Sequence, residues 1–193
     1  MEYQKYQKQN MNKSNLLSLI SDYIKKYPLD SNAIKTLAFL EENEYFWQKE
    51  NILGHVTASA LVINQSVTKS LLTHHLKLDK WLQLGGHVEH SDNDIFDSCI
   101  REVKEESGLE LISFYSKEIF DIDVHLIPNL KNASLSHFHY DIRFLIVASD
   151  KEQINFDFNE SNIVKWFNFA EIVNLSLDES IYRMIEKTKK ILS

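Results

Sequence analysis

Three glutamates that could hold a metal ion lie close together in the sequence, at Glu102, Glu105 and Glu106. The segment 94–107 is predicted to be a helix, and at ~100° per residue its three glutamates fall within about one quadrant, beside an apolar stripe. Carboxylates this close repel one another and raise each other's pKa unless positive charge lies among them. Oxygen ligands suit hard divalent cations, so this helix face predicts a site for Mg²⁺ or Mn²⁺.

Two adjacent glycines, Gly85 and Gly86, precede this helix in a chain with only 4 glycines. Glycine lets a backbone come close to a ligand, so a carbonyl in this turn could add a neutral metal ligand. The competing interpretation is a solvated acidic helix face, balanced by Arg101 and Lys104. For an arbitrary run of this kind that interpretation would be right roughly nine times in ten. The glycine pair is the feature that weighs against it here.

Two further segments, 120–126 and 137–144, alternate between apolar and polar residues, which is typical of β-strands with one polar face. The polar positions include Asp123, His125, His137, His139 and Arg143. Alternation usually marks a face turned to solvent, but three histidines among four other charged residues exceed what solvation needs. We therefore expect this face to line a substrate pocket and to bind phosphate, a sugar or an additional metal. His87, which follows the glycine pair, could also touch substrate.

The elements that must position these residues form a simple order along the chain. Helices are predicted in the first 50 residues, with Ser14 as the first N-terminal cap, and the capping box Ser176-x-x-Glu179 opens a last helix. Strands are predicted over 56–63, 68–76, 82–89, 120–126, 137–144 and 163–167. This order favours an α+β fold, an α/β/α sandwich with a mixed sheet flanked by helices. We expect residues 1–50 to form a helical hairpin packed on a main domain of residues 51–193.

Composition limits the class of protein further. A chain of 193 residues with a net charge of −7 does not attract nucleic acid or anionic membranes by bulk charge. Its one cysteine, Cys99, excludes an intrachain disulfide and fits a reducing compartment, most simply the cytoplasm. We find no secretory signal, and the longest apolar runs are far too short to span a bilayer.

The segment 85–109, GGHVEHSDNDIFDSCIREVKEESGL, resembles the Nudix box, G-x5-E-x7-R-E-U-x-E-E-x-G-U, where U is a bulky aliphatic residue. The stretch REVKEESGL matches the second half at every fixed position. The first half has one extra residue before Arg101, and Asp92 or Asn93 stands in place of its Glu; we favour Asp92. In the family this acid supports the box arginine, so Arg101 is expected to pair with Asp92, or with Glu89, through two hydrogen bonds.

The resemblance extends over most of the chain, from Gly54 to the C-terminus. The stretches GHVTASALVI, THHLKLDKWLQLGGHVE, DIDVHLIP and HFHYDIRF are similar to one subgroup of bacterial Nudix proteins. The resemblance implies a Nudix-like mixed sheet and hydrolysis, dependent on Mg²⁺ or Mn²⁺, of the pyrophosphate in a nucleoside diphosphate linked to another moiety. Candidate substrates are ADP-ribose, other nucleoside diphosphate sugars, dinucleoside polyphosphates and oxidised nucleotides, and the sequence does not rank them.

The resemblance also implies roles for individual residues. The implied metal ligands are the carbonyl of Gly86 and the carboxylates of Glu102, Glu105 and Glu106. Glu106 is the strongest single ligand. Glu105 or Glu160 is the general base, and Arg101 orients a carboxylate of the box.

Two other classes of function compete with the hydrolase. A Nudix-fold domain can bind nucleotides as a sensor without turnover, but such domains usually lose acids of the box, whereas Arg101, Glu102, Glu105 and Glu106 are all present here. An isopentenyl-diphosphate-isomerase-like enzyme shares the fold, but Cys99 lies on the apolar stripe rather than in a catalytic position. The expected partner is a small nucleotide-type substrate, without stable nucleic-acid or membrane binding. The oligomeric state stays open, with a homodimer among the options.

Overall fold

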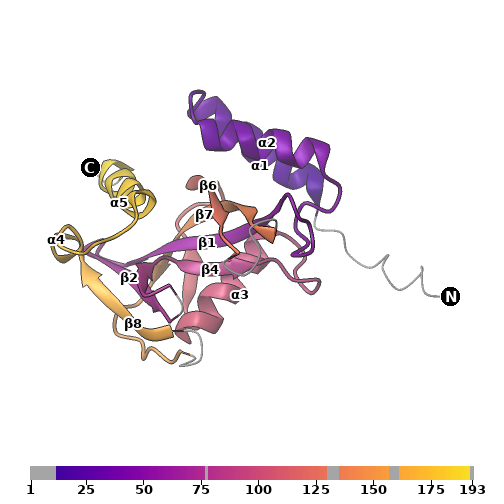
Figure 1. Ribbon diagram of the computed structural model, residues 1–193. Helices are drawn as coiled ribbons and strands as arrows, with labels where there is room; N and C mark the ends of the chain where they lie inside the picture. Colours follow the sequence, from indigo (N-terminus) through magenta and orange to yellow (C-terminus); the bar gives the residue numbers. More distant parts are fainter. Residues whose placement is uncertain (1–11, 77, 130–134, 157–160, 192–193) are drawn as a thin grey trace.

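The computed structural model describes residues 12–76, 78–129, 135–156 and 161–191, and within them one curled, mixed sheet forms the centre (Figure 1). Its strands are β1 (Gly54–Asn64), β2 (Lys69–His75), β3 (Lys80–Leu82), β4 (Leu84–His87), β5 (Ile112–Phe114), β6 (Asp121–Ile127), β7 (His137–Ala148) and β8 (Ser161–Asn168). The helices are α1 (Lys13–Lys26), α2 (Ser31–Glu42), α3 (Ile95–Ser107), α4 (Phe169–Ile172) and α5 (Glu179–Ile191).

Alternating residues of β1 bury themselves in two separate cores on the two faces of the sheet. Val56 and Ala58 pack in one core with Val103 of α3, whereas Leu61 packs in the other with Met184 of α5. Successive side chains of a strand point to opposite faces, so α3 and α5 cover opposite faces of the sheet. The predicted α/β/α sandwich with a mixed sheet is confirmed.

The parallel pairing of β1 with β7 organises the polar residues of the sheet. It runs from Gly54 opposite Phe138 to Asn64 opposite Ala148. β6 lies antiparallel on the other side of β7. His55 is thereby opposite His139, and His139 is in turn opposite His125. The predicted alternation of these strands is confirmed, and their polar positions meet.

The N-terminal helices form the expected hairpin, which packs against β6 and β7 (Figure 1). The Phe39 ring stacks on the Tyr140 ring with centroids 4.0 Å apart, and Asn32 Nδ2 donates to the Ile122 carbonyl at 3.5 Å. The prediction that Ser14 caps the first helix is wrong. The cap is Asn12, whose Oδ1 accepts from the Asn15 N–H and is free to do so because Asn12 is extended, while Ser14 is already helical.

Helix α3 begins and ends where the sequence predicts. Asp94 Oδ1 accepts from the N–H groups of Phe96 and Asp97, both at 2.9 Å. Gly108 ends the helix with φ at 71°, in the left-handed region that glycine adopts readily. The buried stripe includes Cys99, as expected, and its burial raises the pKa of the thiol. The glutamates are therefore held on a rigid helix with a fixed start, end and buried face.

Other predictions need correction. The last helix begins at Glu179, so Ser176 lies outside it and is too far upstream to be its N-terminal cap. A carboxylate instead caps the short helix α4, where Glu171 accepts from the Asn168 N–H at 2.8 Å. The sequence analysis predicted neither α4 nor β5, because both are too short to show a period. Across the described residues, no helix combines the length and apolarity that a bilayer crossing requires.

Candidate active site

Arg101 lies at the centre of a cluster of charged side chains between α3 and the loop that precedes it. Its Nε and Nη2 donate to the two carboxylate oxygens of Asp92 at 3.0 and 2.9 Å, and Nη2 also donates to the His87 carbonyl at 2.8 Å. Its Nη1 donates to Glu102 and to Glu105, both at 2.9 Å. Every N–H of the guanidinium therefore has an acceptor. The acidic cluster consists of Arg101, Asp92, Glu102, Glu105 and Glu106.

Asp92 is the buried partner that fixes Arg101, with a side chain only 4% exposed. Its Oδ2 also accepts from the Glu89 N–H and from the Ser98 hydroxyl, both at 2.8 Å. Burial by itself would raise the pKa of this carboxyl, but the hydrogen bonds from Arg101, Glu89 and Ser98 hold the pKa below its ordinary value. Of the two acids that the sequence left open as partner of Arg101, the structure places Asp92 in the bidentate pair.

The glycine pair brings the backbone of β4 against the carboxylates of α3. The Gly85 N–H donates to Glu106 Oε2 at 2.8 Å. A Cβ added to Gly86 would lie 2.7 Å from Glu102 Oε2, closer than such atoms can approach. Two carboxylates against a bare backbone form an all-oxygen donor set, which is what a hard divalent cation binds. The residues present therefore fit such an ion.

The remaining predicted members of this site lie differently. Glu105 is on the outer side of α3, with a side chain 59% exposed and one oxygen held by Arg101. Glu160, the second candidate for the general base, lies outside the described residues. The structure thus gathers Gly86, Glu102 and Glu106 tightly and Glu105 at their edge, and the roles of all four stay predictions.

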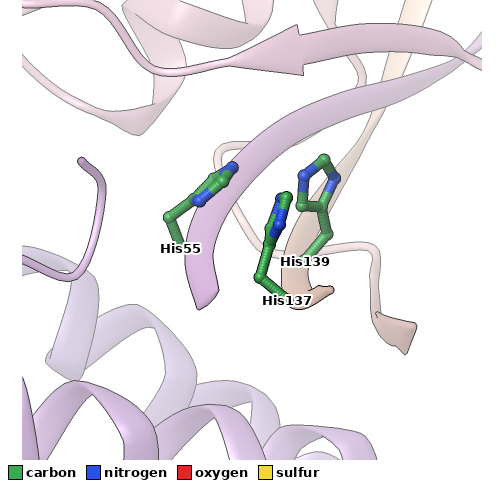
Figure 2. A group of neighbouring side chains, drawn as sticks. All are labelled: His55, His137 and His139. Atoms are coloured by element: carbon green, nitrogen blue, oxygen red, sulfur yellow. The ribbon is translucent and has the colours of Figure 1, made fainter. Parts of the chain in front are cut away.

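A second cluster, the histidine cluster, consists of His55, His137 and His139 (Figure 2). His55 comes from β1 and the other two from β7, and the three rings gather on one face of these two paired strands (Figure 2). The centroid of the His55 ring lies 4.9 Å from that of His137 and 4.7 Å from that of His139. Among the described residues, one ring nitrogen from each histidine lies within 4.8 Å of the other two.

His87 and His125 flank this cluster. The His87 ring centroid lies 5.0 Å from that of His55 and 5.2 Å from that of His139. The ring centroid of His125 lies 5.6 Å from that of His139, and His125 Nδ1 is 3.0 Å from Asp123 Oδ2. Burial, followed by repulsion from neighbouring histidines, lowers the pKa of His139 to about 3. Burial and nearby positive groups lower the pKa values of His55 and His87 to about 4. These three rings are neutral at pH 7.

Strand β4 separates the two clusters. Gly86 is turned toward Glu102, whereas the ring of the next residue, His87, is turned toward His55. This follows from the alternation of side chains along a strand. His87 nevertheless contacts both clusters, because its carbonyl accepts from Arg101. His87 thus connects the acidic cluster, where pyrophosphate chemistry is expected, to the histidines, which are expected to bind substrate.

Two predicted substrate residues, Asp123 and Arg143, belong to a network of ion pairs on the histidine side of the sheet. Arg143 is 2% exposed, and its Nε donates to Asp141 Oδ2 at 2.7 Å. Its Nη2 is 3.4 Å from Asp123, which also accepts from Arg183 of α5 at 3.0 Å. The charges of both residues are already paired within the protein. Their contact with substrate stays a prediction.

His55 was not predicted as a site residue, and the strand predicted from the sequence begins one position later, at Val56. A signal was present, because polar His55, Thr57 and Ser59 alternate with apolar residues in the stretch GHVTASA. Such alternation inside an apolar strand indicates a buried polar face. The identity of the neighbouring strand, which brings His139 to it, could not be obtained from that pattern.

Comparison with known proteins gives a consistent family assignment for most of the chain. The model of the NUDIX domain family matches residues 54–188. A curated relative, the mRNA-decapping enzyme subunit 2 of Saccharomyces cerevisiae (strain YJM789), is 28% identical over 138 residues, which are 69% of this chain and 13% of that protein. The chain thus spans a small part of the length of this relative.

Solved structures give the same picture. A NUDIX-family hydrolase from Clostridium perfringens is 25% identical with a TM-score of 0.52, covering 71% of this chain and 97% of that chain. A C. elegans Ap4A hydrolase is 14% identical with a TM-score of 0.55, covering 71% and 96%. The NUDIX domain of Shewanella oneidensis NrtR, complexed with ADP ribose, is 16% identical with a TM-score of 0.53, covering 72% and 88%. The last two likenesses concern the fold alone.

Proposed function

The chain belongs to the NUDIX domain family and is a Nudix hydrolase, and from this premise we propose that it hydrolyses the pyrophosphate of a nucleoside diphosphate linked to another moiety. We propose a nucleotide sugar such as ADP-ribose as the substrate and Mg²⁺ or Mn²⁺ as the cofactor. The single observation that carries the proposal is the placement of Glu102 and Glu106 against the backbone of Gly85 and Gly86.

Nudix enzymes generally use divalent metal ions. We propose that Glu102, Glu106 and the carbonyl of Gly86 hold the ion, with Glu105 at the edge of the site. When bound, such an ion neutralises phosphate charge and makes water more acidic. Arg101 orients Glu102 and Glu105 through its Nη1, and Asp92 in turn fixes Arg101.

Glu105 is our candidate for the group that takes the proton of the attacking water. Arg101 holds only its Oε2 in the hydrogen bonds described above, and the side chain reaches solvent. Glu160 is the alternative candidate. A general base must lie within hydrogen-bond reach of the proton that it removes, so exchange of either residue would identify the base by a loss of kcat with little change in KM.

We propose that the substrate lies along the end of β4, with its pyrophosphate on the α3 side. The remainder of the substrate then extends over the opposite face, where His87, His125, His137 and His139 lie. Known relatives support a substrate of this general chemistry. They include an Ap4A hydrolase, an m7GpppN-mRNA hydrolase and a domain bound to ADP ribose. Ap4A, the m7GpppN cap and ADP ribose each join a nucleoside to another group through phosphates.

We also propose that residues 51–193 form the hydrolase domain and that residues 1–50 are an extension of it. The family match begins at residue 54, just after the hairpin. The packing of Phe39 on Tyr140 attaches this extension to the sheet. Membership of the bacterial subgroup named above stays a prediction.

The test is a phosphate-release screen over nucleotide sugars, dinucleoside polyphosphates, capped RNA and nucleoside triphosphates. It is run with Mg²⁺, with Mn²⁺ and with a chelator. Glu106→Gln is compared with Glu110→Gln, a matched change at an exposed glutamate whose partner is Lys104. We expect metal-dependent turnover of a nucleotide sugar that Glu106→Gln abolishes and Glu110→Gln retains. Turnover that survives Glu106→Gln would contradict the site, and turnover of another class alone would replace the proposed substrate.

A further inference from the structure

We propose that the histidine cluster holds a transition-metal ion of the Zn²⁺ class, at a centre separate from the glutamates of α3. The three ligands are His55, His137 and His139. The proposal does not depend on the substrate or on turnover at the acidic cluster. It depends on buried nitrogen atoms without partners, on the spacing of the three rings and on the hydrogen atoms that they carry.

Buried polar atoms without partners are the first observation. His55 is 1% exposed, and neither of its ring nitrogens has a hydrogen-bond partner among the residues that the structure describes. The buried Nε2 of His139 also has none. Nearly all buried polar atoms in proteins are hydrogen-bonded, and leaving one unsatisfied carries a penalty in stability. A metal ion bound to one ring nitrogen of His55 and to Nε2 of His139 would satisfy two of these three atoms.

The spacing of the rings is the second observation. One nitrogen from each histidine lies within 4.8 Å of the other two. Zinc binds histidine nitrogens at about 2.0–2.1 Å, which places tetrahedral ligands roughly 3.4 Å apart. Small rotations of side chains already directed toward one another close this difference (Figure 2). No rearrangement of β1 or β7 is needed, because their pairing already sets His55 opposite His139.

The hydrogen atoms on the rings are the third observation. His137 Nδ1 lies 3.2 Å from the Leu135 carbonyl oxygen. A carbonyl only accepts, so Nδ1 carries the hydrogen and Nε2 keeps a free lone pair. Metal-binding histidines usually show this second hydrogen bond, which orients the ring.

The same observations decide between the ligands that this face could take. Three imidazole nitrogens that face one another are a standard donor set for Zn²⁺ and similar ions. Mg²⁺ prefers oxygen ligands, so the histidines and the glutamates select different ions. His137 and His139 are partly exposed, which leaves room for a water or a substrate oxygen as a fourth ligand.

The test measures metal binding directly, on protein purified without a polyhistidine tag and stripped with a chelator. Zn²⁺ is titrated calorimetrically in excess Mg²⁺, and Co²⁺ is titrated while its visible absorption spectrum is recorded. We expect about one Zn²⁺ per chain and a tetrahedral Co²⁺ spectrum. The double variant His137→Gln/His139→Gln should bind Zn²⁺ at least 100-fold more weakly, and each single variant at least tenfold more weakly.

Two controls locate the ion. His90→Gln changes an exposed histidine that lies outside the cluster against Trp47, and Glu106→Gln changes the acidic cluster; both should keep the Zn²⁺ affinity. If circular dichroism shows that the double variant is unfolded, the Zn²⁺ affinities of the two single variants decide the test instead. The proposal is overturned if the wild-type chain binds no Zn²⁺ in excess Mg²⁺, if the folded histidine variants bind it as tightly as wild type, or if Glu106→Gln loses it.

Discussion

The acidic cluster and the histidine cluster lie on opposite sides of β4 and differ in how far their polar atoms are hydrogen-bonded. In the acidic cluster every N–H of Arg101 has an acceptor, and Asp92 is buried with its own partners. In the histidine cluster, both ring nitrogens of His55 and the Nε2 of His139 are buried and have no hydrogen-bond partner within the described part of the chain. Hydrogen bonds within the protein therefore fix the side chains of the acidic cluster. The histidine cluster lacks such bonds at these atoms, which is why a bound metal ion is proposed for it.

The difference follows from the charges of the two donor types. Neighbouring carboxylates repel one another strongly, so they can only be gathered around a resident cation, which here is Arg101. Neutral imidazoles repel one another little and can be packed together without one. A charged ligand site thus needs internal support, while a neutral site can be left unsatisfied at a moderate cost in stability.

The largest expected effect comes from breaking the acidic cluster at its metal-binding end. Glu106→Gln should lower kcat/KM about 1000-fold, because loss of one carboxylate charge weakens the binding of the proposed metal ion. Such an ion supplies several kcal/mol of transition-state stabilisation. Steady-state kinetics at saturating Mg²⁺ measures this. The melting temperature should hardly change, since the volume is kept. A fully active variant would mean that the site lies elsewhere.

The two adjacent glycines separate the catalytic from the structural contribution of β4. Gly86→Ala places a Cβ against the movable end of Glu102, and should lower kcat/KM about 100-fold through misplacement of that carboxylate. Gly85→Ala instead meets the backbone of Ser59 at 2.4 Å with φ at 143°, and should destabilise the fold. Thermal denaturation of both variants checks the contrast; equal stability losses would refute it.

Asp92→Asn tests the internal support of the acidic cluster. We expect a loss of about 2 kcal/mol in the free energy of unfolding at pH 7, because the change removes the charge from a buried ion pair. The pKa of Asp92 is held below its ordinary value of 3.8, so its contribution is present above that pH. The contribution is lost as the pH falls through the lowered pKa.

The measurement is urea denaturation of both proteins from pH 7 to pH 2. The difference between wild type and Asp92→Asn should stay constant down to about pH 4 and shrink below it. A difference that is already lost at pH 6 would point to another titrating group. Asp97→Asn, at an exposed position of the same helix, is the matched control.

The smallest expected effect lies on the histidine side. His139→Ala should raise KM about threefold to tenfold and leave kcat nearly unchanged, because this face is proposed to contact the substrate away from the reacting phosphorus. His90→Gln serves again as the control. Initial rates over a range of substrate concentrations give both constants, and an unchanged KM would remove His139 from the substrate pocket.

The residues of the acidic cluster lie within one short segment of the sequence, so their proximity could be predicted from local patterns. The period of α3, its cap at Asp94 and its end at Gly108 can all be identified within one short segment. Asp92 was a suitable partner for Arg101 despite the extra loop residue. The histidine cluster was predicted only in part, because His55 joins it through the parallel pairing of β1 with β7, and no local pattern specifies which strands pair.

The caps show the limits of local patterns from another side. Asn12 and Ser14 both carry side chains able to cap a helix, and the backbone conformation of Asn12 decided between them. Similarly, Ser176 and Glu179 have the spacing of a capping box, yet the helix begins too late for it. Helix ends fray and vary by a residue or two, so the type and spacing of capping residues do not specify the exact first residue.

The parallel pairing of β1 with β7 also has a consequence for the order of folding. The hydrogen bond from Arg101 to Asp92 spans 9 positions of the chain, whereas that from Thr57 of β1 to Asp141 of β7 spans 84. Contacts between distant segments form only after a large loss of chain entropy, and they slow folding. The acidic cluster can therefore assemble within one helix and the loop before it, whereas the histidine cluster exists only after the sheet has closed.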